Sequence, residues 1–149
     1  MDFYIQCLSA FIGCLGFAFV FRIHKNIHFA LLGSLGGTIG WICYVLLVNS
    51  FHPILANLIA MMGVSLYSEL MARYLKAPAT IFIVVGCFPL VPGKGIYQTM
   101  LYLISNDRSM FLNSLLETIG IALALATAIL IISTVFKVIK NIKNIRYRS

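Results

Sequence analysis

Long runs of apolar residues with few or no charges are the feature that most constrains how this chain can fold. Residues 3–21 contain no charged side chain, and a helix of that length crosses the roughly 30 Å hydrocarbon core of a bilayer. Similar runs follow, so we expect membrane-spanning helices at about residues 3–21, 29–49, 53–75, 79–105 and 112–136. The sequence therefore predicts an all-α fold, a polytopic membrane helix bundle with about five transmembrane helices, in one transmembrane domain over residues 1–149.

Composition excludes an ordinary soluble domain. Hydrophobic residues make up 61% of the 149 residues and charged residues only 10%, whereas soluble domains average about 45–50% apolar and about 25% charged residues. The mean hydropathy of +0.99 agrees with this. The chain is therefore expected in a bilayer, and its charges are few enough to be considered one by one.

The fourth run is broken in its middle. The residues that interrupt helix hydrogen bonding are Pro89, Pro92, Gly93 and Gly95. Lys94 adds a formal charge beside the break, and a charge at the bilayer centre costs at least about 2.5–3.5 kcal/mol. Irregular backbone at membrane depth persists only where it is buried in protein or lines a wet cavity. We therefore predict that the fourth transmembrane helix is discontinuous at Pro89–Gly95 and that the break holds the functional site.

The chemistry of the break favours a substrate that carries a carboxylate. A helix that restarts after Gly95 presents unpaired amides and the positive end of its dipole, and both attract anions. Lys94 supplies a counter-charge, and Tyr97, Gln98 and Thr99 supply hydrogen-bonding groups. The predicted substrate-binding residues are Pro89, Pro92, Gly93, Lys94, Gly95, Tyr97 and Thr99. The alternative is a kinked helix that only packs, with Lys94 extending to the membrane interface.

Three other charged residues are candidates for gating or coupling. Glu69 and Arg73 are four positions apart and share one helix face, where they form either a gate or a structural ion pair. Glu117 lies in the first turns of the fifth predicted helix. Its carboxylate either faces a transport pathway or interacts with the helix dipole.

The positions of the basic residues predict how the chain crosses the membrane. They gather after the first span (Arg22, Lys25), at the end of the third (Arg73, Lys76) and in the tail at residues 137–149. Because cytoplasmic segments carry an excess of Lys and Arg, five crossings place the N-terminus outside and the C-terminus in the cytoplasm. A re-entrant fourth segment would place the tail outside, so the rule favours a full crossing. We expect the basic tail to lie on anionic lipids and expect no nucleic-acid partner.

The second span carries a stripe of small residues, Gly33, Gly36, Gly37 and Gly40. Small residues at this spacing let neighbouring helices approach closely. The alternative is a helix thinned to line a pathway. The sequence favours close packing.

No residue pattern points to a metal, a cofactor or catalysis. The cysteines and histidines are spread along the chain without the spacing of a metal site. A membrane-embedded lipid enzyme usually needs clustered acids, histidines or a metal. We therefore expect no metal, no cofactor and no enzyme activity. The sequence also lacks a phosphate-binding loop, which favours an ion gradient as the driving force.

Two stretches resemble the threonine/serine exporter family. Pro89-Leu-Val-Pro-Gly, followed after a spacer by Gly95-Ile-Tyr-Gln-Thr-Met, is similar to the family's signature. Ala72-Arg-Tyr-Leu-Lys-Ala-Pro-Ala-Thr is similar to its lead-in. In size, span number and basic end, the whole chain looks like the small membrane subunit of the two-component form. Lys94 departs from the family pattern, in which a small or apolar residue is common at that position.

The resemblance implies a transport subunit in the bacterial inner membrane. Such a subunit pairs with a larger membrane subunit of the same family, or forms a homo-oligomer. It exports small carboxylate-bearing metabolites, either threonine/serine-like amino acids or dicarboxylates such as succinate. The alternative is a structural or assembly subunit without a substrate site of its own.

Overall fold

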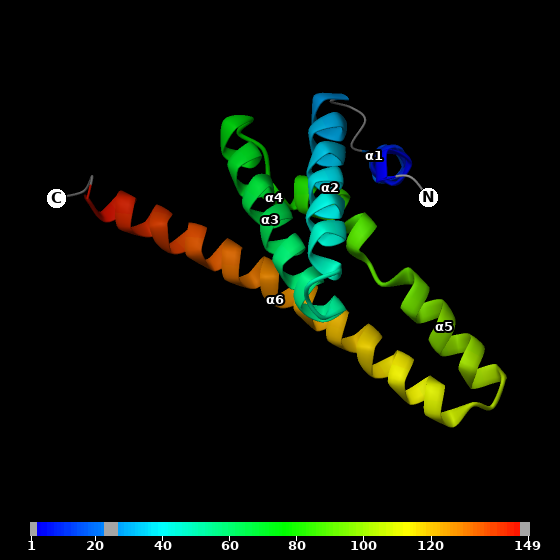
Figure 1. Ribbon diagram of the computed structural model, residues 1–149. Helices are drawn as coiled ribbons and strands as arrows, with labels where there is room; N and C mark the ends of the chain where they lie inside the picture. Colours follow the sequence, from blue (N-terminus) through cyan, green and yellow to red (C-terminus); the bar gives the residue numbers. More distant parts are fainter. Residues whose placement is uncertain (1–2, 23–26, 147–149) are drawn as a thin grey trace.

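The computed structural model describes residues 3–22 and 27–146, and all regular elements within them are helices (Figure 1). In chain order these are α1 (Phe3–Val20), α2 (Ile27–Val48), α3 (Pro53–Tyr74), α4 (Ala79–Cys87), the 3-10 helix η2 (Phe88–Leu90), α5 (Gly93–Ile104) and α6 (Arg108–Arg146). The predicted all-α fold is confirmed.

The helices that are suited to a bilayer coincide with the predicted apolar runs. Among the described residues, α1, α2, α3 and α6 are each long and apolar enough to cross a membrane. The pair α4–η2 and α5 passes the same test together, with a bend of 49° between its two parts. The broken fourth run is therefore present as a bent pair, and the candidate spans among the described residues number four, or five if this pair is one span.

The two ends of α3 follow from local sequence. Pro53 occupies its first position, where the missing N–H costs no hydrogen bond. At the other end, Lys76 adopts a left-handed conformation with φ of 51°, and the Ala77 N–H donates to Ala72 O over 2.9 Å. This pattern satisfies carbonyls that a helix end leaves open, although a glycine more often fills the left-handed position.

The last helix begins earlier than the apolar pattern predicts. We expected a start near residue 112, but α6 begins at Arg108 and runs without interruption to Arg146. Asp107 caps this start, because its Oδ1 accepts a hydrogen bond from the Met110 N–H over 3.2 Å. Polar capping therefore places the start before the first apolar residues, and most of the predicted tail continues α6.

The glycine stripe of α2 lies where its neighbours approach most closely. A Cβ on Gly36 would lie 2.9 Å from the ring of Tyr67 on α3, and Gly37 lies against Cys14 of α1 and Gly86 of α4. The Tyr67 hydroxyl also donates to Leu32 O across the α2–α3 interface, over 3.0 Å. Of the two interpretations of this stripe, the structure supports close packing.

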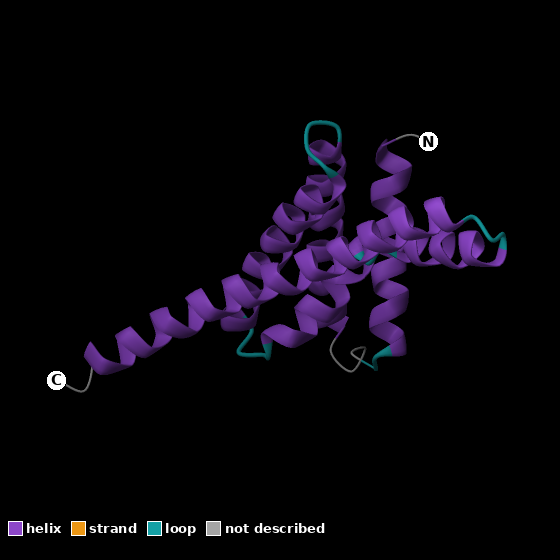
Figure 2. Ribbon diagram, turned by 90° about the horizontal axis from the view of Figure 1, so that it is seen from below, coloured by secondary structure: helices purple, strands orange, loops and turns teal. Residues whose placement is uncertain are grey.

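Helices α5 and α6 form a hairpin that extends away from the other helices. Figures 1 and 2 show α5 lying alongside the first part of α6, beyond the ends of α2 and α3. Farther along, α6 packs on α3, and the buried residues Ala60 of α3 and Ala128 of α6 belong to one apolar cluster. This α3–α6 seam separates two cavities, which take their walls from opposite ends of the two helices.

Candidate functional site

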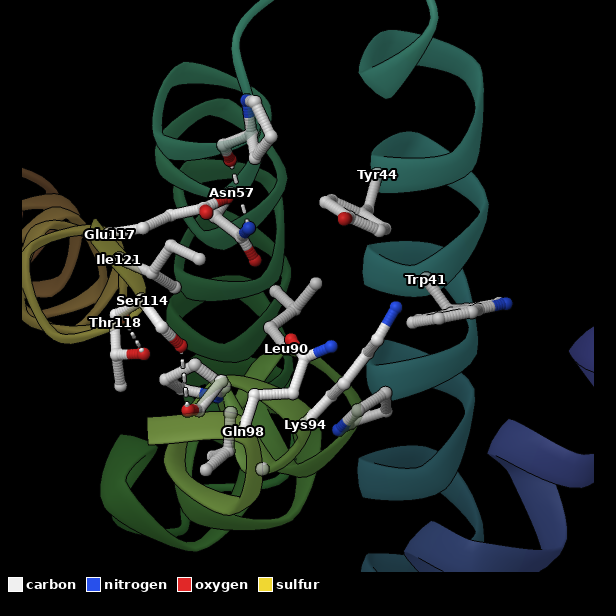
Figure 3. A pocket seen from close by; sticks show the side chains of 16 residues that line it. Trp41, Tyr44, Asn57, Leu90, Lys94, Gln98, Ser114, Glu117, Thr118 and Ile121 are labelled. Atoms are coloured by element: carbon white, nitrogen blue, oxygen red, sulfur yellow. Dashed lines mark hydrogen bonds between the residues drawn. The ribbon is translucent and has the colours of Figure 1, made fainter. Parts of the chain in front are cut away.

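A cavity of about 510 Å³ lies at the break between η2 and α5 (Figure 3). Its walls come from α2, α3, the break, the first turns of α5 and α6. The lining residues are Trp41, Tyr44, Pro53, Asn57, Pro89, Leu90, Val91, Pro92, Gly93, Lys94, Gly95, Gln98, Ser114, Glu117, Thr118 and Ile121. We call this the break cavity.

The backbone at the break explains why a cavity forms there. Val91 is extended, with φ of −61° and ψ of 130°, and Pro92 is the N-cap of α5 with φ of −76° and ψ of 55°. Pro89 and Pro92 both lack an N–H, so the helical hydrogen-bond ladder cannot continue through them. No side chain caps the start of α5. The Gly93 N–H donates to Val91 O over 2.7 Å, so the first turn of α5 leaves the N–H groups of Lys94 and Gly95, which line the break cavity, without an intrahelical partner.

The break cavity carries one cation and one anion on opposite sides. Figure 3 shows Lys94 extending toward Trp41 of α2, whereas Glu117 enters from α6 beside Asn57 of α3. The Asn57 Nδ2 donates to Pro53 O over 2.9 Å, which holds this amide in place. The two charges are thus presented by different helices to one space.

Glu117 lies deeper in its helix than the sequence suggested. Because α6 begins at Arg108, Glu117 is well beyond the first turn. The helix dipole acts mainly within that turn. Of the two interpretations of Glu117, the structure therefore favours a carboxylate that faces a cavity.

Hydroxyl groups join α5 to α6 beneath the break cavity. Thr99 is only 4% exposed, and its hydroxyl donates to Gly95 O over 2.7 Å. Its Oγ1 also lies 3.1 Å from Ser114 Oγ, with which it shares a hydrogen bond across the two helices. A Cβ on Gly95 would collide with Thr118 Oγ1. Thr99 therefore lies at a helix contact, and Gly95 both lines the break cavity and allows the close approach of α6.

Of the predicted binding residues, two do not line the break cavity. These are Thr99, described above, and Tyr97, whose side chain is 67% exposed. Gln98 lies one turn after Lys94 on the same face of α5, and it does line the break cavity. The structure thus brings Pro89, Pro92, Gly93, Lys94 and Gly95 together with Glu117, and it leaves Tyr97 outside.

Several lining residues were not identified from the sequence. They are Trp41, Tyr44, Asn57, Ser114 and Thr118. A signal exists for part of this set, because Ser114, Glu117 and Thr118 follow the i, i+3, i+4 pattern of one helix face in an otherwise apolar run. The α2 and α3 residues carry no such signal, since they reach the break cavity only through the fold.

Glu69 and Arg73 lie elsewhere, at a second cavity of about 560 Å³. Of the two interpretations of these residues, the structural ion pair is not found: in the part of the chain that the structure describes, no ion pair joins these two side chains. Arg73 instead lies over the ring of Phe136, with 4.4 Å from Cζ to the ring centroid. Its Nη2 donates to Phe136 O over 3.4 Å. The two predicted charge clusters therefore belong to separate sites.

No metal centre is evident in residues 3–22 and 27–146, where no group of three or more His, Cys, Asp or Glu side chains is placed to hold an ion.

Comparison with known proteins identifies the family. The family model described as threonine/serine exporter, ThrE, matches residues 6–135, which is most of the chain. Neither a curated protein nor a solved structure matches the sequence. With its apolar helices and broken span, the chain belongs to the threonine/serine exporter family of membrane transport proteins.

Proposed function

We propose that this protein is a membrane subunit that exports a small amino acid such as threonine or serine, and that it binds the substrate in the break cavity. The observation that carries the proposal is the placement of Lys94 and Glu117 on opposite sides of one space. A free amino acid is a zwitterion, so it carries one group for each of these charges.

The proposed contacts follow from charge and hydrogen-bonding capacity. The substrate carboxylate lies at Lys94 and the start of α5, where the helix dipole adds to the attraction. The substrate ammonium lies at Glu117, beside the amide of Asn57. Tyr44 and Gln98 offer partners for a side-chain hydroxyl. A cavity of about 510 Å³ has room for a small amino acid.

Of the two substrate classes implied by the resemblance, the amino acids fit better than the dicarboxylates. A dicarboxylate such as succinate would bring its second carboxylate toward Glu117. Like charges at close range repel, and an unpaired buried charge is costly in a site of low dielectric constant. The departure at Lys94 is then a counter-charge for the substrate carboxylate.

We also propose that the subunit works with a larger membrane subunit of the same family or with further copies of itself. The α5–α6 hairpin leaves the other helices and exposes Leu101, Leu112 and Leu116. In the bilayer these side chains face either lipid or a partner. Movement of this hairpin at the break would open the break cavity toward one side of the membrane, with an ion gradient as driving force.

The proposed orientation has the N-terminus outside and the C-terminus in the cytoplasm of a bacterial cell. It rests on the distribution of Lys and Arg along the sequence. Cysteine accessibility measured from each side of intact cells would test it, with reporters near residues 2 and 149.

The second candidate is an assembly subunit that binds no substrate. The exposed apolar side chains of the hairpin favour it, because they suit a docking role. Transport distinguishes the two candidates. Proteoliposomes containing the chain, with and without the larger subunit, would be loaded with labelled serine, threonine or succinate, and efflux would be followed.

Two charge-removing variants and one matched control make this test specific. Hydrogen bonds to charged groups contribute about 1.5–3 kcal/mol, so Lys94→Gln and Glu117→Gln should each weaken amino acid transport about tenfold to a hundredfold. Lys76→Gln removes a charge outside the break cavity and should leave transport unchanged. Wild-type transport in both break-cavity variants would contradict a binding role for this cavity. Faster efflux of succinate than of serine or threonine would contradict the proposal that the substrate is a zwitterionic amino acid.

A further inference from the structure

The second cavity lies at the opposite end of the α3–α6 seam from the break cavity. Its volume is about 560 Å³, and its walls come from the end of α3, the loop before α4, the start of α4 and the later part of α6. The lining residues are Glu69, Ala72, Arg73, Ala77, Ala79, Ser133, Phe136, Lys137 and Lys140. We call this the basic cavity.

Three cations from two helices share this space with a single acid. Arg73 belongs to α3, whereas Lys137 and Lys140 are three positions apart on α6 and therefore share a helix face. Glu69 is the acidic residue that lines the basic cavity. One carboxylate cannot neutralise three positive charges, so the net positive charge of the lining residues favours binding of an anion.

Arg73 is held in a fixed position at the wall. The ring of Phe136 lies under its guanidinium group, and Phe136 O accepts one hydrogen bond from Nη2. A guanidinium group has five N–H donors in a rigid fork that matches the oxygens of a phosphate group. One donor thus fixes the group, and the fork provides further donors for a ligand.

The start of α4 adds a second source of positive potential. Ala79 is its first residue and lines the basic cavity, and its N-cap, Pro78, makes no side-chain hydrogen bond to the helix. The amides of a first helical turn have no intrahelical partner and favour anions. Ser133 adds a hydroxyl from the α6 side.

The place of the basic cavity along the helices suits a phosphate at the membrane surface. Arg73 lies in the last turn of α3. On α6, the apolar run ends at Phe136, directly before Lys137. Both helices therefore change from apolar to basic at this level, which is where lipid phosphates lie beside a membrane protein.

We propose that the basic cavity binds the phosphate group of an anionic ligand. That group comes either from the headgroup of an anionic phospholipid or from free inorganic phosphate. Arg73, Lys137 and Lys140 hold its oxygens, and the start of α4 supports them. This site is separate from the substrate site, and it stands whether or not the break cavity carries an amino acid.

The test uses the full-length protein in nanodiscs of phosphatidylcholine. The thermal unfolding midpoint is measured with and without added phosphatidylglycerol, and separately with millimolar inorganic phosphate at fixed ionic strength. Native mass spectrometry then counts the phosphatidylglycerol molecules retained by each variant. We expect at least one of the two phosphate sources to raise the midpoint of the wild-type protein.

Two variants of the basic cavity are compared with two matched controls. Arg73→Gln and the double variant Lys137→Gln/Lys140→Gln should weaken binding about fivefold for each charge removed. Lys76→Gln removes a charge at the same end of α3, and Lys143→Gln/Arg146→Gln removes two charges farther along α6. Both controls should weaken binding less than the variants of the basic cavity do. The unfolding midpoint in phosphatidylcholine alone shows whether each variant is folded. If Arg73→Gln does not fold, the double variant alone tests the site.

The outcomes separate the two sources and can overturn the site. A midpoint shift with phosphatidylglycerol only assigns the site to lipid, and a shift with inorganic phosphate only assigns it to the free ion. No shift with either source would overturn the proposal. An equal loss in Lys143→Gln/Arg146→Gln would also overturn it, because general attraction by the basic tail would then explain the binding.

Discussion

The break cavity and the basic cavity both take walls from α3 and α6, but the charges that line them differ. The break cavity is lined by one cation, Lys94, and one anion, Glu117. The basic cavity sets Arg73, Lys137 and Lys140 against Glu69. Similar volumes of about 510 and 560 Å³ show that size does not distinguish them.

This difference shows how ligand class follows from charge balance. A space with one charge of each sign suits a zwitterion, whereas a space with excess positive charge suits an anion. The backbone differs as well, because the break cavity opens onto a helix interrupted by two prolines and the basic cavity lies beside regular helix ends. The first arrangement suits a site whose backbone bends at the break, and the second suits a contact with the membrane surface.

The largest effect is expected when the break cavity is given the charge balance of the basic cavity. Glu117→Lys places two cations in the break cavity, so a substrate ammonium would be repelled and a second carboxylate attracted. We expect serine efflux to fall about a hundredfold, corresponding to roughly 3 kcal/mol, and succinate efflux to become measurable. Efflux of serine and of succinate from proteoliposomes measures this change in substrate preference. Serine efflux at the wild-type rate would show that Glu117 does not contact the substrate.

A smaller effect is expected from a methyl group at the break itself. In Gly95→Ala the new Cβ collides with Thr118, and such overpacking typically costs about 1–3 kcal/mol. Gly93→Ala is the matched control, because a Cβ there meets nothing within 4 Å. Thermal unfolding in detergent should show a lower midpoint for Gly95→Ala alone. Equal midpoints in the two variants would mean that α6 does not approach Gly95 closely.

The hydroxyl contact between α5 and α6 should contribute less. Thr99→Val removes the hydrogen bonds of Thr99 to Gly95 and Ser114, and the expected loss is about 1 kcal/mol. Thr127→Val serves as control, since the Thr127 hydroxyl bonds only to carbonyls of its own helix, those of Leu123 and Ala124. Hydrogen exchange of the α5 amides would report the difference. Faster exchange in both variants, or in neither, would contradict a specific role for Thr99.

The smallest effect is expected at the ring beneath Arg73. Phe136→Leu keeps an apolar side chain but removes a cation–π contact worth about 0.5–1 kcal/mol at an exposed site. Retention of phosphatidylglycerol should fall about twofold to fivefold, because Arg73 loses part of its support. Serine efflux is the internal control and should not change. An unchanged lipid count would show that Phe136 does not position Arg73.

Much of the fold was predictable because its signals are local. Apolar runs of membrane length identified the helices, and the cluster of proline and glycine identified the break. The start of α6 was missed because an aspartate cap, Asp107, outweighed the apolar periodicity. The ion-pair interpretation of Glu69 and Arg73 failed for a different reason. Spacing on one helix permits that pair, but Arg73 instead finds Phe136, 63 positions away in the sequence.

The candidate site was only partly predictable, for a physical reason. The residues of the break lie together in the chain, so their irregular backbone and charge are visible in the sequence. Their partners are not, because Trp41, Tyr44 and Asn57 reach the break cavity only after α2 and α3 have packed. Within α5, helical geometry separates Gln98, which faces the break cavity, from Tyr97, which does not.

The unbroken course of α6 has a mechanical consequence. Its 39 residues contain no proline, and a helix of that length extends about 58 Å. The buried contacts at Ala124 and Ala128 lie between the segments that line the two cavities. A tilt of α6 about its buried middle would move Glu117 and Lys137 in opposite directions, so the walls of the two cavities would shift together.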